Sequence, residues 1–356
     1  MGSPPQPNLR QAWPQPSRPR PIVIIGAGGI VNDAHLPAYR LAEFPVAGIF
    51  DVNRDRAEML AAKWGLKVFS SLAEAAVSDA VFDLATPPAA HFDLLSALPE
   101  DAIVLIQKPM GRDLDEASRI LKLARARKLT AAVNFQLRFA PMMLALQDAL
   151  DRGLLGRLID VEIHLNILTP WHLFPFLKGL PRIEIAVHSI HYFDFIRALL
   201  GNPTSVYART MGHPLSDMAQ TRTSAILDFG KDVRCTLSIN HDHDFGRKFQ
   251  DSTFRFEGDQ GVAVVKMGIL LNYPQGEPDE LWIAQRGGDW TQIPLQGAWF
   301  PHAFVGKMSN LQRFAAGEDP TLISSVEDAW HTMALVEACF SSSAAPATPV
   351  PSRPKA

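Results

Sequence analysis

The chain has 356 residues, which is enough for about two domains of ordinary size, each with its own hydrophobic core. Its composition is typical of globular proteins, with 47% hydrophobic residues, 20% charged residues and a net charge of −3. Nucleic-acid binding requires clustered lysines and arginines, but the 34 Lys and Arg are interspersed with 37 Asp and Glu, so we expect no nucleic-acid partner.

The longest apolar helical stretch, residues 185–200, contains histidines, an aspartate and an arginine and is too short to cross a bilayer. We therefore expect no membrane span. The cysteines, Cys235 and Cys339, have neither metal-ligand spacing nor the density of a disulfide scaffold, so both are expected to be reduced. Reduced cysteines favour a cytoplasmic location.

Proline-rich segments stand at both ends of the chain. Residues 1–20 have almost nothing to bury, which predicts a disordered or extended leader. Residues 341–356 alternate prolines with small residues, which predicts a flexible tail.

Between residues 21 and 150, short apolar runs alternate with amphipathic stretches, the pattern of a parallel sheet with helices on its faces. The sequence therefore predicts a doubly wound α/β domain. The expected strands are Ile22–Ile25, Val46–Phe50, Val81–Ala85, Ile103–Ile106 and Ala131–Phe135, and the clearest helices are Arg54–Lys63 and Leu114–Arg127.

After about residue 155 the pattern changes to strands without intervening helices, which predicts a mostly antiparallel sheet in an α+β domain. A helix is expected from Pro181 to Gly201 and another from Val326 to Phe340. The expected strands are Ile159–Leu168, Ser205–Thr210, Ser224–Phe229, Val233–Ile239, Thr253–Phe256 and Leu281–Ala284.

A glycine-rich turn follows the first predicted strand and precedes a helix, the context in which dinucleotides bind. Gly26 allows a tight turn, and Gly28, Gly29 and Ile30 lead backbone N–H groups toward a pyrophosphate. The third fingerprint position holds Val31, which should move the helix slightly away from the strand. The same apolar run could also pass for the core of a secretion signal, but the placement of the glycines favours the nucleotide turn.

Asp51 ends the second predicted strand, where a carboxylate can accept hydrogen bonds from an adenosine ribose diol. A carboxylate at this position repels a 2′-phosphate. The sequence therefore favours NAD over NADP, although Asn53 and Arg54 could soften that preference. The alternative is a solvated acid at a strand end.

Two further motifs stand at the carboxyl ends of strands, where open α/β sheets bind ligands. Thr86 and Pro87 follow one strand, with His91 on the next helix, and Gln107-Lys108-Pro109 closes another. With the glycine turn, Arg138 in Asn-Phe-Gln-Leu-Arg-Phe and the His191-x-x-Asp194 helix, these motifs resemble the glucose–fructose oxidoreductase/inositol dehydrogenase (Gfo/Idh/MocA) family over residues 21–345.

The resemblance implies an N-terminal Rossmann domain and a C-terminal domain with a large, mostly antiparallel open sheet that packs against another subunit as a homodimer or homotetramer. It also implies oxidation or reduction of a carbinol carbon on a sugar, inositol or related polyol. Lys108 then corresponds to the lysine that hydrogen-bonds the reacting hydroxyl, with Gln107 in place of the usual glutamate. Thr86, Pro87, His91, Gln107 and Lys108 are expected at the cofactor.

Removal of the hydroxyl proton needs a base, and the resemblance assigns that role to His191. Relatives carry an aspartate four residues before this histidine, where this chain has Val187. Glu184, His188 and His191 share one face of an ideal α-helix. We therefore expect a rearranged relay in which His191 or His188 is the base and Glu184 orients it. The alternatives are a helix-capping role for Glu184 and a core role for His188.

Other residues are expected near the substrate. Trp171 and His172 could form a lid or a sugar-facing wall, or an apolar interface, and Gln136 and Arg138 follow a strand end near the nicotinamide. The Glu184, His188 and His191 face could instead bind a metal with His241 and His243, but the family pattern requires none.

These observations predict an NAD-dependent oxidoreductase with a leader at 1–20, a dinucleotide-binding domain at 21–140, a substrate-binding and oligomerisation domain at 141–340 and a tail at 341–356. Two other functions stay open. One is an NAD-dependent glycosidase of the same fold, and the other is a non-catalytic NAD-binding sensor.

Overall fold

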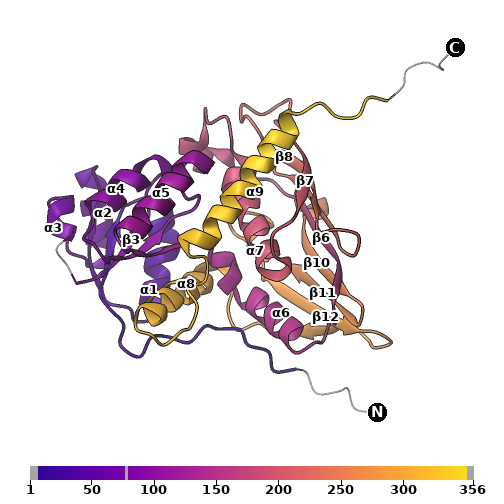
Figure 1. Cartoon of the computed structure of the whole chain (residues 1–356), viewed down its shortest axis with the longest axis horizontal. Coiled ribbons are helices and arrows are strands. Elements are labelled where there is room, and N and C mark those ends of the chain that lie inside the picture. The colour runs from indigo at the N-terminus through magenta and orange to yellow at the C-terminus, as the bar shows by residue number, and fades with distance from the viewer. Residues whose placement is uncertain (1–6, 77–78, 351–356) are drawn as a thin grey trace.

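A computed structural model describes residues 7–76 and 79–350 and contains two β-sheets with helices around and between them (Figure 1). The smaller sheet lies in the N-terminal half of the chain and the larger one in the C-terminal half. Helices α7 (Ile190–Leu200) and α9 (Val326–Ala344) lie between the two halves.

The smaller sheet is the predicted doubly wound sheet. Its strands run parallel in the order β2-β1-β3-β4-β5, so the chain reverses its winding direction between β1 and β3. The strands are β1 (Ile22–Ile25), β2 (Val46–Phe50), β3 (Val81–Leu84), β4 (Ile103–Ile106) and β5 (Thr130–Val133). Their helices are α1 (Leu36–Leu41), α2 (Arg54–Trp64), α3 (Leu72–Ala76), α4 (His91–Ala97) and α5 (Leu114–Ala126). The predicted strands are confirmed to within two residues at each end because both faces of this sheet are covered and the strands read as continuous apolar runs.

The larger sheet has eight strands in the order β13-β12-β11-β10-β6-β9-β8-β7. It is mostly antiparallel as predicted, except that its central strands β6 and β9 pair in parallel. The strands are β6 (Leu158–Asn166), β7 (Ser205–Met211), β8 (Arg222–Asp228), β9 (Arg234–Asn240), β10 (Asp251–Gly258), β11 (Gly261–Lys266), β12 (Glu280–Gln285) and β13 (Thr291–Ile293). The sequence analysis missed β11 and β13.

The segment that leads into α7 is a π-helix, η6 (Glu184–Ser189), rather than ordinary α-helix from Pro181. A π-helical turn holds more residues than an α-turn, so side-chain spacings read from the α-helical period do not apply within it. This difference changes which partners the side chains of Glu184 and His188 reach.

Helix α8 (Trp299–Ala315) was not predicted. Although it belongs to the C-terminal half of the chain, it packs against the N-terminal sheet. Phe304, Met308 and Leu311 of α8 share a core cluster with Ile22 and Ile24 of β1. The two halves therefore have a common core, which strict boundaries at residues 140 and 141 do not describe. Helix α6 (Pro141–Asp151) connects the halves in the chain.

The expectation of a leader with nothing to bury is wrong for residues 7–20. Leu9 is buried, and Trp13 packs edge-on against Phe139 and donates a hydrogen bond to Asp319 (2.7 Å). These two side chains attach the segment to the rest of the protein, and Figure 1 shows it running along the outside of the fold. Residues 1–6 lie outside the described residues.

The predicted tail begins later than residue 341. Helix α9 continues to Ala344, and the hydroxyls of Ser342 and Ser343 accept hydrogen bonds from backbone N–H groups of β7. Residues 351–356 lie outside the described residues. Within 7–76 and 79–350, no helix is both long and apolar enough to span a membrane.

Candidate active site

The glycine turn joins β1 to the first helix, which opens with the π-helical segment η1 (Val31–His35) before α1. Gly26 has φ = +113°, and a Cβ there would lie 2.3 Å from the carbonyl oxygen of Ala85. Only glycine fits both the backbone angle and this close approach to β3. By contrast, nothing lies within 4 Å of a Cβ at Gly28, so the space in front of the turn is open to a ligand. Gly29 and Ile30 begin the helix, where backbone N–H groups have no carbonyl partner within the helix.

Asp51 follows β2 and closes the other side of this turn. One carboxylate oxygen accepts the backbone N–H of Ala27 (2.7 Å) and the other accepts that of Asn53 (2.7 Å). The carboxylate is thus fixed beside the glycines and is partly exposed. A carboxylate that binds the ribose of a dinucleotide is expected at this position.

Thr86 and Pro87 follow β3. Thr86 is half-buried and Pro87 is exposed, but His91 is fully buried. Its Nε2 donates a hydrogen bond to the carbonyl of Thr86 (3.1 Å). Burial lowers the pKa of His91 to about 4, so the ring is neutral. The expectation that the His91 side chain contacts a cofactor is therefore corrected. His91 stabilises the turn at Thr86 through this hydrogen bond.

Gln107 follows β4 and accepts a hydrogen bond from the side-chain amide of Asn134 (2.9 Å). Asn134 is fully buried at the end of β5. This contact occupies the Gln107 oxygen and leaves its amide N–H groups available to a ligand.

Lys108 lies next to the start of the histidine helix. Its Nζ donates to the backbone carbonyl of Val187 (2.6 Å). No carboxylate lies within ion-pair distance of Nζ in the described part of the chain. Burial lowers the pKa of Lys108 from 10.5 to about 8, since the ammonium is partly removed from water.

His191 lies one helical turn beyond the Val187 carbonyl that Lys108 contacts. The residue is 5% exposed. Its ring stands edge-on to Phe135 (6.2 Å between ring centroids) and to Trp299 (5.9 Å). Its Nδ1 is buried and has no hydrogen-bond partner among residues 7–76 and 79–350. Burial, and then the charge of Lys108, hold the pKa of His191 well below its usual value. The ring is therefore neutral and able to accept a proton.

His188 belongs to an aromatic cluster with His241 and Trp171. The rings of His188 and His241 lie 4.5 Å apart, and Trp171 lies 5.8 Å from the first and 5.7 Å from the second. The Trp171 indole N–H donates to Asp242 (2.9 Å), which fixes the ring against the two histidines. Trp171 is thus a wall of this cluster, whereas His172 beside it is exposed and joins no contact of the site.

Glu184 does not orient His188 or His191, so that part of the predicted relay is wrong. Its carboxylate is fully buried, accepts a hydrogen bond from Ser189 (2.6 Å) and faces Nε2 of His241 (3.6 Å). The wider turn of η6 is the physical reason, because it rotates Glu184 out of the α-helical register with the histidines.

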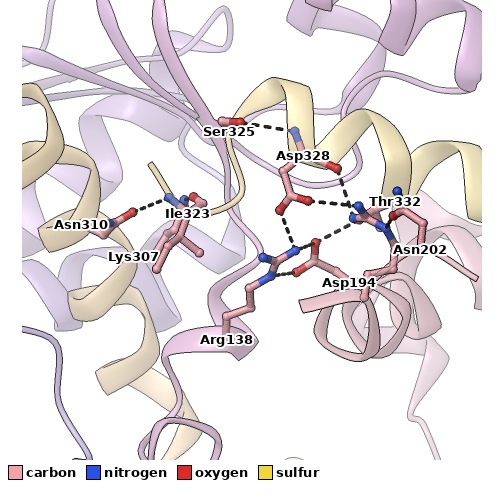
Figure 2. A network of polar contacts seen from close by, with 10 residues as sticks. Arg138, Asp194, Asn202, Lys307, Asn310, Ile323, Ser325, Asp328 and Thr332 are labelled. Carbon is pink, nitrogen blue, oxygen red and sulfur yellow. Dashed lines mark hydrogen bonds and ion pairs between the residues drawn. The ribbon is translucent and has the colours of Figure 1, made fainter. Parts of the chain in front are cut away.

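Arg138 is not available to a substrate, contrary to the prediction. Figure 2 shows its guanidinium between Asp194 of α7 (2.6 Å to each of two oxygens) and Asp328 of α9 (2.8 Å). Arg197 and Thr332 complete this buried network. We call these five residues the arginine network; it joins the segment after β5 to the helix that carries His191.

Gln136, in the same segment, is buried with an unpaired side-chain oxygen, so it can still meet a ligand group.

Sequence reasoning missed two features of this site. The first is the role of His241, which the sequence suggested only as an alternative metal ligand. The parallel pairing of β6 and β9 brings Thr169 to His241, where a hydrogen bond joins Oγ1 and Nδ1 (2.8 Å), and an antiparallel expectation could not show this. The second is the backbone carbonyl of Val187, which no side-chain motif reveals.

The histidines and acids of this region do not form a metal site. Among the described residues, no group of three or more His, Cys, Asp and Glu side chains is arranged to hold a metal ion. The hypothesis of a metal bound by the face of Glu184, His188 and His191 with His241 and His243 therefore has no support in the geometry of the described residues.

Comparison with known families places both halves of the chain. Residues 20–135 match the oxidoreductase family with an NAD-binding Rossmann fold, and residues 143–264 match the GFO/IDH/MocA C-terminal domain.

Among curated proteins, the chain is 36% identical over 132 residues to a putative oxidoreductase, YceM, of Salmonella typhimurium, covering 36% of this chain and 43% of that protein. It is 30% identical over 145 residues to glucose-6-phosphate 3-dehydrogenase of Bacillus subtilis, covering 40% of this chain and 41% of that protein. These alignments span about two-fifths of each relative's length.

Solved structures share the fold over nearly the whole chain. An oxidoreductase from Agrobacterium radiobacter in complex with NAD⁺, L-tartaric acid and magnesium superposes with a TM-score of 0.75 at 20% identity. The match covers 92% of this chain and 97% of that one.

Proposed function

Given that this chain belongs to the Gfo/Idh/MocA oxidoreductase family, we propose that it transfers a hydride between NAD and a carbinol carbon of a sugar, inositol or related polyol. One observation carries the proposal: the Lys108 ammonium from the Rossmann half bonds the helix that presents His191 from the other half. An acid and a base thus share one site, which oxidation of an alcohol requires.

The residues at the glycine turn fit a dinucleotide. The open space before Gly28 and the free N–H groups of the first helical turn suit a pyrophosphate, and the fixed carboxylate of Asp51 suits a ribose diol. Thr86, Pro87, Gln107 and Lys108 stand at neighbouring strand ends, where the nicotinamide would lie. When bound, the oxidised nicotinamide supplies the acceptor for the hydride.

In the oxidation direction, Lys108 donates a hydrogen bond to the substrate hydroxyl and stabilises negative charge that develops on its oxygen. Neutral His191 accepts the hydroxyl proton as the carbinol carbon loses its hydride. The products are a carbonyl compound, the reduced cofactor and a proton held on His191. Phe135 and Trp299 exclude water from the imidazole and keep it neutral between turnovers.

Replacing Asp51 tests the cofactor assignment. Asp51→Ala removes both the ribose ligand and the acceptor for the N–H of Ala27, so the dissociation constant for NAD should rise about tenfold or more. It also removes the charge that repels a 2′-phosphate, so the preference for NAD over NADP should narrow. Fluorescence titration with both cofactors measures the ratio, and an unchanged ratio would refute the assignment.

The pH dependence of the initial oxidation rate tests Lys108. Burial favours its uncharged form, so the ammonium is lost as the pH rises through about 8 and the rate should fall there. Because the pKa of His191 is well below its usual value, no loss of rate is expected near the usual histidine pKa. Lys108→Arg should move the alkaline decline to higher pH, since arginine keeps its charge. An alkaline limb that Lys108→Arg leaves in place would assign it to another group.

The activity itself is tested by incubating the protein with NAD and a panel of aldoses, inositols, alditols and sugar acids. The proposal predicts that at least one compound produces the absorbance of reduced nicotinamide. Release of a free sugar from a glycoside without net reduction would indicate the glycosidase, and NAD binding without turnover of any compound would indicate the sensor.

We also propose a homodimer or homotetramer formed through the outer face of the large sheet. Tyr207 and Ile226 are opposite each other on β7 and β8 and are 68% and 50% exposed, which supports burial against a second subunit. The cytoplasm is the proposed location because both cysteines are free and buried.

A further inference from the structure

Three basic side chains, Lys108, His188 and His191, lie where Lys108 meets the histidine helix. Lys108 bonds only a backbone carbonyl, and Nδ1 of His188 and Nδ1 of His191 have no hydrogen-bond partner within the described residues. Nδ1 of each histidine is buried. Buried polar atoms without partners are rare in native proteins, so a bound ligand is expected to complete them.

The titratable groups that act on these nitrogens are basic, and of them Lys108 carries a charge at neutral pH. Burial lowers the pKa of His188 well below its usual value, and His241, Lys108 and His191 lower it further. Burial and Lys108 act in the same direction on His191. No acidic side chain offsets these effects on Lys108, His188 or His191 in the part of the chain that the structure describes.

Two acids that contact the histidine cluster already have partners. Glu184 is fully buried, accepts a hydrogen bond from Ser189 and faces His241. Asp242 accepts the indole N–H of Trp171. A ligand bound at this site therefore meets more basic than acidic side chains.

We propose that the substrate is a polyhydroxy acid whose carboxylate is next to the reacting carbinol and binds Lys108 and His188. This inference rests on the proposed function and names its substrate class. The Lys108 ammonium contacts the carbonyl of Val187, the residue directly before His188, so it lies beside the segment that carries His188. A carboxylate on the carbon next to the carbinol lets one ammonium contact both the hydroxyl and the acid.

A carboxylate suits this site better than a phosphate ester. Phosphates are usually bound by arginine or by several backbone N–H groups. Arg138, which follows β5, is already bound to Asp194 and Asp328. One ammonium and one imidazole match the two oxygens of a carboxylate.

The test compares compounds that differ only in charge. The holoenzyme with NAD is assayed with D-gluconate, its neutral amide D-gluconamide, D-glucitol and D-glucitol 6-phosphate, and the same comparison is made with D-galactonate and its amide. We expect kcat/KM for an acid to exceed that for its amide by roughly 10- to 100-fold, the range of one charge-assisted hydrogen bond.

Variants of His188 assign the effect to this site. His188→Gln should lower the ratio of acid to amide about tenfold through KM, and His188→Glu should lower it further by repelling the carboxylate. The matched control is His164→Gln, which replaces a half-exposed histidine of β6 that pairs with Asp251 outside the site, and it should keep the wild-type ratio. If the His188 variants do not fold, calorimetric binding of gluconate and gluconamide to the wild-type NAD complex gives the same comparison.

Equal or better turnover of the amide, of glucitol or of the phosphate ester would overturn the inference and leave the proposed function intact. A ratio that His188→Gln does not change would also overturn it. If none of these compounds reduces NAD but an aldose or an inositol does, the inference fails and the proposed function stands; if no compound of the wider panel reduces NAD while NAD binds, both fail.

Discussion

His191→Asn should lower kcat for polyol oxidation by roughly two to four powers of ten, the usual contribution of a general base. Asparagine keeps much of the size of histidine but cannot accept the hydroxyl proton at neutral pH. The ring lies on α7, away from the glycine turn, so the dissociation constant for NAD should stay nearly unchanged. Steady-state kinetics and a fluorescence titration with NAD measure the two quantities.

The matched control for this variant is His164→Asn. His164 is about half exposed on β6 and pairs with Asp251, remote from Lys108 in the fold, so its loss should leave kcat at the wild-type value. Should His191→Asn retain activity within about tenfold of the wild type, His191 is not the base, and His188 becomes the residue to test next.

Arg138→Met should reduce the free energy of unfolding by about 3–5 kcal/mol, because it leaves the buried carboxylate of Asp194 without its main partner. Asp194 is 1% exposed in its side chain and Arg138 is 12% exposed, so water cannot replace the lost contacts (Figure 2). The charges of Arg138 and Arg197 also hold the pKa of Asp328 below its usual value despite its burial. Chemical denaturation monitored by tryptophan fluorescence measures the change.

Arg234→Met is the control for the arginine network. Arg234 also contacts two acids, Asp160 (2.6 Å) and Glu162 (2.9 Å), but its side chain is 59% exposed. Exposed pairs contribute about 0–1 kcal/mol because solvent screens them. If Arg138→Met cost no more than Arg234→Met, the network would not be a stabilising connection between the two halves.

The sequence predicted the helices and strands whose burial produces a clear pattern of apolar residues. The five strands of the Rossmann sheet lie in continuous apolar runs, and each is found within two residues of its predicted ends. The short β13 and the strand β11 carry weaker patterns and were missed, as was α8. Helix α8 is interrupted near its start, since Phe300 has extended backbone angles, which obscures its helical period.

Sequence motifs supplied candidate site residues, whereas contacts that form only in the folded chain could not be predicted. Motif context predicted Lys108, His191 and Asp51, and the structure brings Lys108 to the histidine helix. No local pattern shows that η6 is a π-helix, and with it Glu184 reaches His241 in place of His188. Arg138 was misassigned because a charged residue near a strand end looks the same in sequence whether it meets a substrate or a buried acid.

Transfer of a labelled hydride distinguishes direct hydride transfer to the cofactor from other reactions. A polyol or sugar acid found to be a substrate is prepared with deuterium on the reacting carbinol carbon, and the NADH formed is analysed by mass spectrometry and NMR. The account predicts that one deuterium appears at C4 of the nicotinamide and that Lys108→Met and His191→Asn form labelled NADH far more slowly. NADH without deuterium, or product formed with the label still on its carbon, would contradict direct hydride transfer at this site.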